Sequence, residues 1–314
     1  MSMRTNRRAM LFALESAYND GTTTPDAATD ALLMRSIDVT PLSGNDIERN
    51  FIRPYYGNSP VAPGEKHVQV QVEFELSPSG TPGTAPAWGK TLRCCGWAEV
   101  IDTTTVGAET VTYSMVSDDE DSGVFFAHVD GTLHKGRGAH GSAQFTLNAE
   151  SMPVLRATLY ALISPVTAAE LPTVDLSTWV DGLAINTANT ETLQVFGAAS
   201  PFSQFTFDQA ADVKQRKVVG ANDIAITGRS PSGSFTIDDP GVDVVNFFEK
   251  AQNAETGPLK LTHGKNAGEI IEFNMPSIGI ASPSYADGDG VQMLSMDYKP
   301  QPIDGNDEVT IVLK

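Results

Sequence analysis

The stretch that decides the fold lies at residues 67–76 and reads His-Val-Gln-Val-Gln-Val-Glu-Phe-Glu-Leu. Apolar and polar residues alternate along it, which predicts a β-strand with one buried face and one face toward water. The apolar positions are Val68, Val70, Val72, Phe74 and Leu76, and the polar positions are Gln69, Gln71, Glu73 and Glu75. The sequence therefore predicts a sheet that is dry on one side and wet on the other.

Shorter alternating stretches lie throughout the chain. In the first half they occupy residues 32–39, 110–116, 123–133 and 142–149. In the second half they occupy residues 202–208, 223–228, 233–238, 259–263, 269–275 and 291–298. Hydrophobic residues make up 40% of the chain and charged residues only 19%, with 27 glycines and 19 prolines. This composition fits short strands joined by turns better than a helical bundle, so we expect a mainly β fold.

Two short helices are expected among the strands. The first occupies residues 87–92, after a loop rich in glycine and proline. Asp239-Pro240 opens the second, because a carboxylate caps a helix N-terminus and proline suits the first helical turn. Its apolar stripe consists of Val244, Phe247, Phe248 and Ala251. Each half of the chain thus carries one short helix.

The two halves follow the same order of elements. Each has an alternating strand, then a helix, then a glycine-rich turn (residues 136–141 and 288–290) that leads into a last alternating strand. Such self-similarity is typical of a repeated module. We predict a first module at residues 1–164, a linker at 165–181 and a second module at 182–314.

The charge of the chain is one-sided. Asp and Glu number 39 and Lys and Arg number 21, which gives a net charge of -18. Such a surface repels nucleic acid, because DNA binding needs cations that displace condensed counterions. The charge also has a simpler explanation, namely solubility. Composition alone does not separate the two.

The cysteines and the N-terminus bear on the compartment. Cys94 and Cys95 are adjacent, and adjacent residues do not easily reach disulfide geometry, so we expect folding in a reducing cytoplasm. Arg4, Arg7 and Arg8 precede an apolar run at residues 9–14 that is too short for a signal peptide and is interrupted by Glu15. No stretch reaches membrane-spanning length. A soluble protein that is not exported by this route is expected.

Several motifs resemble the major tail tube proteins of long, non-contractile-tailed (siphovirus-type) phages. They are the opening region at residues 7–18, Pro25, the segment at 36–42, Glu48-Arg49, Gly123-Val124 and the strand at 143–149 before Pro153. The resemblance covers the first half by motif and the second half by pattern.

The resemblance implies tandem β-sandwich modules, each with a flanking short helix, whose inner strands join into an inter-subunit β-barrel. Six modules form a ring in that family, and stacked rings conduct DNA from the capsid to the host. Two modules per chain would make the ring a homotrimer. The competing layout is one tube module with an outer decoration module, in which the ring is a hexamer.

The resemblance also implies partners and a location. The partners are copies of the chain and the tape-measure, tail terminator and distal tail proteins, while DNA passes through without specific binding. The protein would be a structural virion component of the tail, made and assembled in the host cytoplasm. Neither an enzymatic activity, a cofactor nor a membrane is implied. A secreted β-rich adhesin is the alternative class, and it predicts an export signal and often disulfides.

Under this resemblance, the wet face of the strand at residues 67–76 has a candidate role. Gln69, Gln71, Glu73 and Glu75 are candidates to line the lumen of the tube, where amides and carboxylates would not hold a sliding genome. The other interpretation is that these four residues face outside solvent. The sequence leaves both open.

Three motifs that could carry chemistry have simpler explanations. Residues 136–141 match a G-x-G-x-x-G string, but a strand rather than a helix follows, so a flexible turn or inter-ring loop is expected. His128, His134 and His140 recur every six residues without Cys or carboxylate partners that would complete a metal site. Residues 230–233 do not form a nucleophile elbow, because proline adjoins the serine.

An acidic run lies between two expected strands. It contains Asp118, Asp119, Glu120 and Asp121, and its spacing lacks the alternation of an EF-hand calcium loop. We expect a solvated loop that projects toward a neighbouring ring. With no catalytic, cofactor or metal constellation in the sequence, a non-enzymatic structural protein is predicted.

Overall fold

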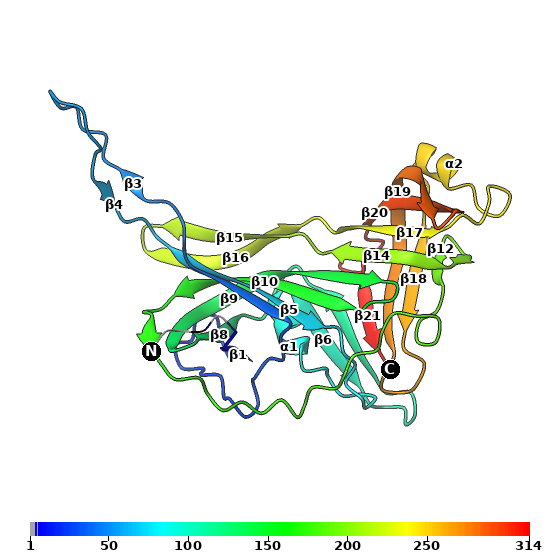
Figure 1. The fold of residues 1–314 in the computed structure, drawn as a ribbon, viewed down its shortest axis with the longest axis horizontal. Helices are drawn as coiled ribbons and strands as arrows, with labels where there is room; N and C mark the ends of the chain where they lie inside the picture. Colours follow the sequence, from blue (N-terminus) through cyan, green and yellow to red (C-terminus); the bar gives the residue numbers. More distant parts are fainter. Residues whose placement is uncertain (1–3, 5) are drawn as a thin grey trace.

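The computed structural model describes residue 4 and residues 6–314, so residues 1–3 and 5 of the predicted first module lie outside the described residues. The first half contains β1 (Arg8–Leu14), β2 (Ser36–Ser43), β3 (Ile47–Glu48), β4 (Val61–Ala62), β5 (His67–Glu75), α1 (Gly89–Cys94), β6 (Trp97–Asp102), β7 (Thr110–Met115), β8 (Gly123–Val129), β9 (Thr132–Asn148), β10 (Val154–Ile163) and β11 (Thr167–Ala168). The second half contains β12 (Leu193–Val195), β13 (Ala198–Ser200), β14 (Phe202–Asp208), β15 (Ala211–Val218), β16 (Ala221–Arg229), β17 (Ser232–Asp238), α2 (Phe247–Gln252), β18 (Thr256–His263), β19 (Ile271–Gly288), β20 (Val291–Pro300) and β21 (Thr310–Leu313). The mainly β fold is confirmed (Figure 1).

One long antiparallel sheet runs through both halves. Its strands lie in the order β2-β5-β10-β9-β14-β17-β20-β19. The strand predicted at residues 67–76 is β5, in the middle of the first four. Its valines and Phe74 are buried and its polar residues alternate with them, as predicted. This sheet is called the inner sheet below.

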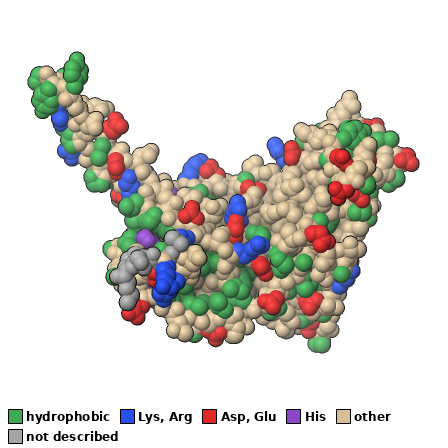
Figure 2. Space-filling model, in the orientation of Figure 1, with side chains coloured by type: hydrophobic (Ala, Val, Ile, Leu, Met, Phe, Trp, Pro, Cys, Tyr) green, Lys and Arg blue, Asp and Glu red, His purple; other side chains and the backbone are tan. Residues whose placement is uncertain are grey.

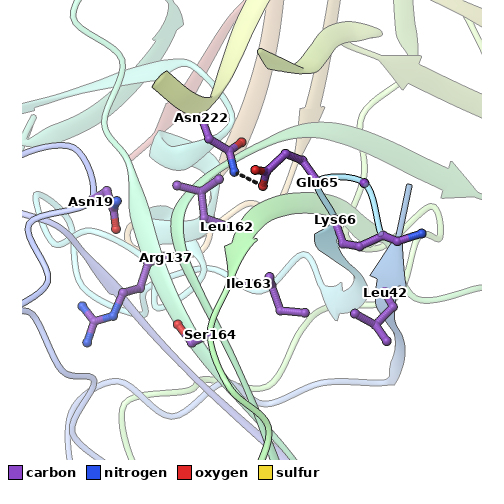
Figure 3. Close-up of a pocket in the computed structure, with 10 residues that line it drawn as sticks. Asn19, Leu42, Glu65, Lys66, Arg137, Leu162, Ile163, Ser164 and Asn222 are labelled. Atoms are coloured by element: carbon purple, nitrogen blue, oxygen red, sulfur yellow. Dashed lines mark hydrogen bonds between the residues drawn. The ribbon is translucent and has the colours of Figure 1, made fainter. Parts of the chain in front are cut away.

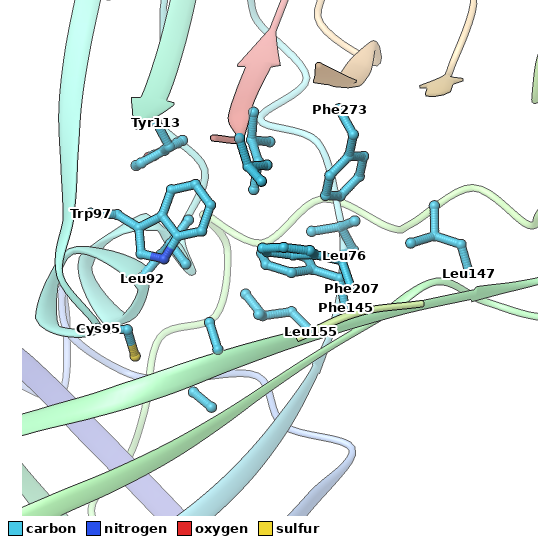
Figure 4. Close-up of a cluster of buried hydrophobic side chains, with 14 of the residues drawn as sticks. Leu76, Leu92, Cys95, Trp97, Tyr113, Phe145, Leu147, Leu155, Phe207 and Phe273 are labelled. Atoms are coloured by element: carbon cyan, nitrogen blue, oxygen red, sulfur yellow. The ribbon is translucent and has the colours of Figure 1, made fainter. Parts of the chain in front are cut away.

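A second layer covers the apolar side of the inner sheet. It contains β1 and β8 in the first half, the β6–β7 hairpin, β21, and β18 with β12 in the second half. Aromatic rings fill the space between the layers, and Phe145 of β9 contacts Trp97, Phe207 and Phe273 (Figure 4). Because these rings come from both halves, the main hydrophobic core spans both of them, while a smaller cluster that includes Leu11 and Phe126 lies at β1 and β8.

The four strands of each half are paired in the same way. In the first half β5 pairs with β2 and β10, and β10 pairs with β9. In the second half β17 pairs with β14 and β20, and β20 pairs with β19. Each set is called a block, and a short helix follows the second strand of each block. The tandem β-sandwich plan is confirmed, and among the described residues the β6–β7 hairpin of the first half has no counterpart in the second half.

Two strand pairings join the halves. In the inner sheet β9 pairs with β14, and in the second layer β7 pairs with the C-terminal β21. The predicted linker at residues 165–181 runs along the first half, where the Trp179 ring stacks on Phe74 and its Nε1 donates to the Ala31 carbonyl at 3.1 Å. The linker is therefore anchored near its C-terminal end, at Trp179.

Three local predictions were wrong. Residues 136–141, predicted as a turn or loop, lie within β9. The glycines make room for close packing, since a Cβ on Gly136 would lie 2.4 Å from the Phe125 ring and one on Gly141 2.6 Å from a β10 carbonyl. Residues 123–133 form two strands separated by a turn, because Asp130 and Gly131 have positive φ angles.

The third wrong prediction concerns the start of α2. The helix begins at Phe247 rather than after Asp239-Pro240, and the side chain of Asn246 accepts a hydrogen bond from the Glu249 amide as its N-cap. Val244, assigned to the apolar stripe, is exposed outside the helix, while Phe247 is buried.

Candidate functional site

The side of the inner sheet that faces away from the core is polar and is called the open face below. The lumen candidates Gln69, Gln71, Glu73 and Glu75 lie on it, on β5. Glu73 accepts a hydrogen bond from Arg156 Nε of β10 at 2.8 Å and one from Ser36 Oγ of β2 at 2.9 Å. The Arg156 guanidinium holds the pKa of Glu73 below its usual value, so this carboxylate stays ionised but paired.

The open face continues across the second block. The pairing register makes the β17 residues counterparts of the β5 candidates, since β17 contacts β20 as β5 contacts β10. These counterparts are Ser232, Ser234, Thr236 and Asp238. The sequence prediction missed them because β17 is shorter and only its repeat relation to β5 would have revealed them.

Acidic residues outnumber basic ones on the open face. The acidic residues are Asp38, Glu73, Glu75, Asp208, Asp238 and Asp297, and the basic ones are Arg137, Arg156 and Lys299. The face therefore repels polyanions and carries no cluster of cations that would hold a phosphate backbone.

A long arm extends from one end of the molecule. It spans residues 47–62, contains the short strands β3 and β4, and projects away from the body (Figure 1). Its tip is apolar and exposed, as the space-filling view shows (Figure 2). The exposed tip residues are Phe51, Ile52, Tyr55 and Tyr56. Ile52 and Tyr56 have relative exposures of 103% and 107%, so no described residue covers them.

A contiguous group of exposed apolar side chains is uncommon on the surface of a soluble monomer. The sequence prediction missed this arm. The sequence signal for the arm was the group of aromatic residues Phe51, Tyr55 and Tyr56 in a segment that shows no strand or helix periodicity.

The root of the arm borders a pocket. Figure 3 shows its lining residues, which come from the segment that follows the arm (residues 64–66), from β2, β9, β10 and β16, and from the loops after β1 and β10. Asn222 Nδ2 donates to Glu65 Oε2 at 2.9 Å across it. Glu65, Lys66 and Arg137 place both signs of charge around the pocket without a nucleophile and base arranged for catalysis.

The β15–β16 hairpin occupies the same position in the second half as the arm does in the first, between the first two strands of its block. Unlike the arm, the hairpin packs against the other half of the chain; it is called the seated hairpin below. His67 and Gln215 are hydrogen bonded at 3.1 Å, Lys217 Nζ donates to the Glu65 carbonyl at 2.8 Å, and the Ile224 amide donates to the Tyr18 hydroxyl at 2.6 Å.

The two ends of the hairpin are fixed by buried polar groups. Before β15, Gln209 Oε1 accepts from Trp97 Nε1 at 3.1 Å and from the Ala143 amide at 3.2 Å. At the end of β16, Arg229 forms an ion pair with Glu308 at 3.0 Å and donates to the Val116 carbonyl at 2.6 Å.

The acidic loop candidates lie between β7 and β8. Asp121 accepts a hydrogen bond from Arg93 Nε at 2.8 Å, and Ser117, just before the run, donates to Asn306 Oδ1 at 2.6 Å. Asp118 and Asp119 lie at the exposed turn, and Glu120 borders a pocket beside Gly96. The loop is held at both ends and exposed at its centre. Contact between Asp118–Asp121 and a neighbouring ring stays a prediction.

Within residue 4 and residues 6–314, no group of three or more His, Cys, Asp or Glu side chains is arranged to hold a metal ion. His140 stacks on Tyr18 with ring centroids 5.8 Å apart, and burial lowers the pKa of this histidine. Burial also raises the pKa of the Cys95 thiol. None of the helices in the described part of the chain is long and apolar enough to cross a membrane.

A family model described as phage tail tube protein matches residues 5–311. The chain belongs to the phage tail tube protein family. The resemblance inferred from the opening motifs is thus confirmed, and the repeated inner sheet, the arm and the seated hairpin are features of a tail tube protein. No match was found among curated proteins.

Membership in the phage tail tube protein family makes the chain a structural component of the virion tail. It also implies that the protein associates with copies of itself and with other tail proteins.

Proposed function

We propose that the chain polymerises into stacked rings that form a hollow tail tube, through which DNA passes from the capsid to the host. The observation that carries this proposal is the inner sheet of two similar blocks joined edge to edge. The outer edge of β2 and the outer edge of residues 281–288 in β19 have no strand partner among the described residues. Free edges on this scale are avoided in soluble monomers, and closure into an inter-subunit β-barrel removes them.

A ring of six blocks would then contain three chains. The contact joins one end of the sheet to the opposite end of the next copy, which is a heterologous interface that closes into a ring when the rotation permits. The repeated blocks, joined by a pairing within the chain, favour this homotrimer over a hexamer with an outer decoration module.

The open face would line the lumen. Gln69, Gln71, Glu73 and Glu75 and their β17 counterparts supply amides, hydroxyls and carboxylates, which repel or release phosphates instead of holding them. DNA would thus slide without specific binding. The alternative is that this face lies outside, and a strongly positive bore would establish that alternative.

The arm and the acidic loop would make contacts beyond the barrel. The exposed tip of the arm, with Phe51 and Tyr55, would bury its apolar surface on a neighbouring copy. Residues 118–121 would face an adjacent ring. The tape-measure, tail terminator and distal tail proteins are the proposed partners at the ends of the tube.

The remaining parts of the proposal concern chemistry and location. We infer a protein without enzymatic activity or cofactor that is made and assembled in the host cytoplasm. A secreted adhesin has no specific observation in its favour.

The test is electron microscopy of the purified protein at high concentration. Hollow tubes with regular striations are expected, together with a smallest ring whose mass equals three chains. A protein that stays monomeric at every concentration, salt and temperature tried would overturn the proposal. A smallest ring of six chains would replace the trimer by the hexamer, and the potential of the bore in a reconstruction would decide between the two faces.

A further inference from the structure

The chain contains one block-to-block junction, and it shows how two blocks fit. In it, β9 and β14 are antiparallel, with Leu147 opposite Phe205, Thr146 opposite Thr206 and Phe145 opposite Phe207. The Phe145 and Phe207 rings lie 6.1 Å apart in the core. The junction is thus defined by its register as well as by its strands.

The register identifies which residue of the second block corresponds to Phe145. In the first block Leu155 of β10 lies between Phe74 and Phe145. In the second block Leu294 of β20 lies between Ile237 and Tyr285. Phe74 and Ile237 hold the same place, since each is one residue before the end of its strand, β5 at Glu75 and β17 at Asp238. Leu294 therefore corresponds to Leu155, and Tyr285 is the counterpart of Phe145. Phe145 is buried, whereas Tyr285 is 63% exposed and its ring contacts the Phe248 ring of α2, with centroids 5.4 Å apart, which leaves most of the Tyr285 side chain uncovered at this edge.

The same counting identifies the counterpart of Phe207. In the second block, Phe207 of β14 pairs with Gly233 of β17, and Gly233 pairs with Tyr298 of β20. Tyr298 lies four positions after Leu294. In the first block, Val39 of β2 pairs with Val70 of β5, and Val70 pairs with Leu159 of β10. Leu159 likewise lies four positions after Leu155. Val39 of β2 is therefore the counterpart of Phe207, and Ile37 is the counterpart of Phe205.

The free edge of β2 presents its backbone groups in the same way as β14 does in the β9–β14 junction. In the existing junction the Ala149 amide donates to the Ser203 carbonyl and the Gln209 amide to the Ala143 carbonyl, which puts Phe205 and Phe207 in the hydrogen-bonded positions. Their counterparts Ile37 and Val39 accordingly direct backbone groups outward. The Ile37 carbonyl accepts a hydrogen bond from the exposed Arg8 side chain at 2.6 Å, as an outward-pointing carbonyl does.

We infer that β2 of one copy pairs antiparallel with residues 284–288 of β19 in the next copy, in the register of the β9–β14 junction. This inference rests on the proposed function, since it specifies the contact that closes the ring. Val39 then lies opposite Tyr285 and covers its ring, and Ile37 lies opposite Asp287. The carboxylate of Asp287 arrives beside the Arg8 guanidinium, which adds a charge-assisted contact.

The residue pair that lies between Val39–Tyr285 and Ile37–Asp287 offers a direct test. Asp38 and Ala286 lie opposite each other in this register, both on the open face and in a non-hydrogen-bonded pair, where Cα atoms are about 4.5 Å apart. That separation lies within the disulfide range of about 4.4–6.8 Å. The native Cys94 and Cys95 are buried and do not compete.

Asp38→Cys and Ala286→Cys are prepared as separate variants, mixed, assembled and oxidised. Covalent dimers are expected only in the mixture, and the double variant is expected to give a covalent trimer as its largest product. Thr146→Cys with Thr206→Cys, the same pair within one chain, serves as the positive control because it links without assembly. Asp38→Cys mixed with Tyr285→Cys is the control for register, since a shift of one residue turns the side chain to the other face.

The outcomes separate this inference from the proposed function. Tubes whose Asp38→Cys and Ala286→Cys subunits stay unlinked, while the positive control oxidises, would overturn the register and leave the tube intact. Preferential linkage in the Tyr285→Cys mixture would also overturn it. Absence of tubes from the unmodified protein would instead reject the proposed function. If either variant assembles poorly alone, both are diluted into unmodified protein, and dimers are then expected in the mixed tubes.

Discussion

The arm and the β15–β16 hairpin occupy equivalent positions in the two blocks but have different surroundings. The hairpin is seated on the first half through Tyr18, His67 and Glu65. The arm extends from the body with its apolar tip exposed (Figure 1). The difference follows from the connectivity, because a first block lies within reach of the hairpin whereas no second block of the same chain lies within reach of the arm. The seated hairpin thus shows what the arm is expected to do on a neighbouring copy.

Removing the apolar tip of the arm should have the largest effect on assembly. We expect Phe51, Ile52, Tyr55 and Tyr56 replaced together by serine to abolish tube formation, because the surface that the neighbour buries is lost. Folding should change by less than about 0.5 kcal/mol, since these side chains are exposed in the single chain. Sedimentation measures assembly and thermal unfolding measures stability. Val106→Ser, an exposed valine remote from the arm, is the matched control and should assemble normally. Tubes of normal length from the serine variant would show that the arm is dispensable.

Breaking the buried ion pair at the base of the hairpin should destabilise the chain itself. Arg229→Ala leaves Glu308 without its cation in a site where the two side chains are 14% and 9% exposed, so we expect a loss of about 3 kcal/mol in the free energy of unfolding. Denaturant unfolding measures it. Lys214→Ala, which removes an exposed pair with Asp212, should cost at most about 1 kcal/mol. Equal losses in the two variants would contradict a special role for the buried pair.

Removing one hydrogen bond should loosen the hairpin without affecting the arm. Tyr18→Phe removes the hydroxyl oxygen that accepts a hydrogen bond from the amide of the buried Ile224, so we expect a loss of about 1–2 kcal/mol in the free energy of unfolding. Hydrogen exchange should become faster in residues 211–229 and stay unchanged in residues 47–62. Tyr56→Phe, at the exposed tip of the arm, is the control for stability. Faster exchange in both segments would argue that the hairpin and the arm are not independent.

Acidification should lower the free energy of unfolding through His140, which stacks on Tyr18, the residue that contacts the hairpin. Burial lowers the pKa of His140 in the folded chain, while the unfolded chain takes up this proton near pH 6.5. Because the unfolded state then binds more protons, the free energy of unfolding falls as the pH drops below about 6.5 and levels off below the lowered pKa. His140→Gln should flatten this dependence between pH 7 and 5 more than His134→Gln, whose site is less buried. A pH profile unchanged by His140→Gln would rule out this contribution.

The fold class was predictable because alternation is a local property. The pattern at residues 67–76 placed β5 and its buried face correctly, and the shared order of elements in the two halves revealed the tandem plan. The glycines at residues 136–141 were misread because their function is to admit the Phe125 ring and a β10 carbonyl. Such packing neighbours are distant in the chain and leave no local signal.

The candidate site was predictable in part. The polar residues of β5 lie on the open face, but their β17 counterparts and the apolar tip of the arm were missed. Lumen and inter-ring roles for residues 69–75 and 118–121 stay predictions, because they depend on neighbouring copies.

The sequence by itself determined that this protein is a β-rich, acidic, repeated structure with one wet and one dry face to its main sheet. Period-two alternation and turn residues act over a few neighbouring positions, so they are legible without a structure. Only the tertiary structure decided that β9 pairs with β14, that the hairpin is seated while the arm is free, and that the edges of β2 and β19 stay open. Those outcomes depend on hydrogen bonds and packing between strands far apart in the chain, and local sequence does not specify them.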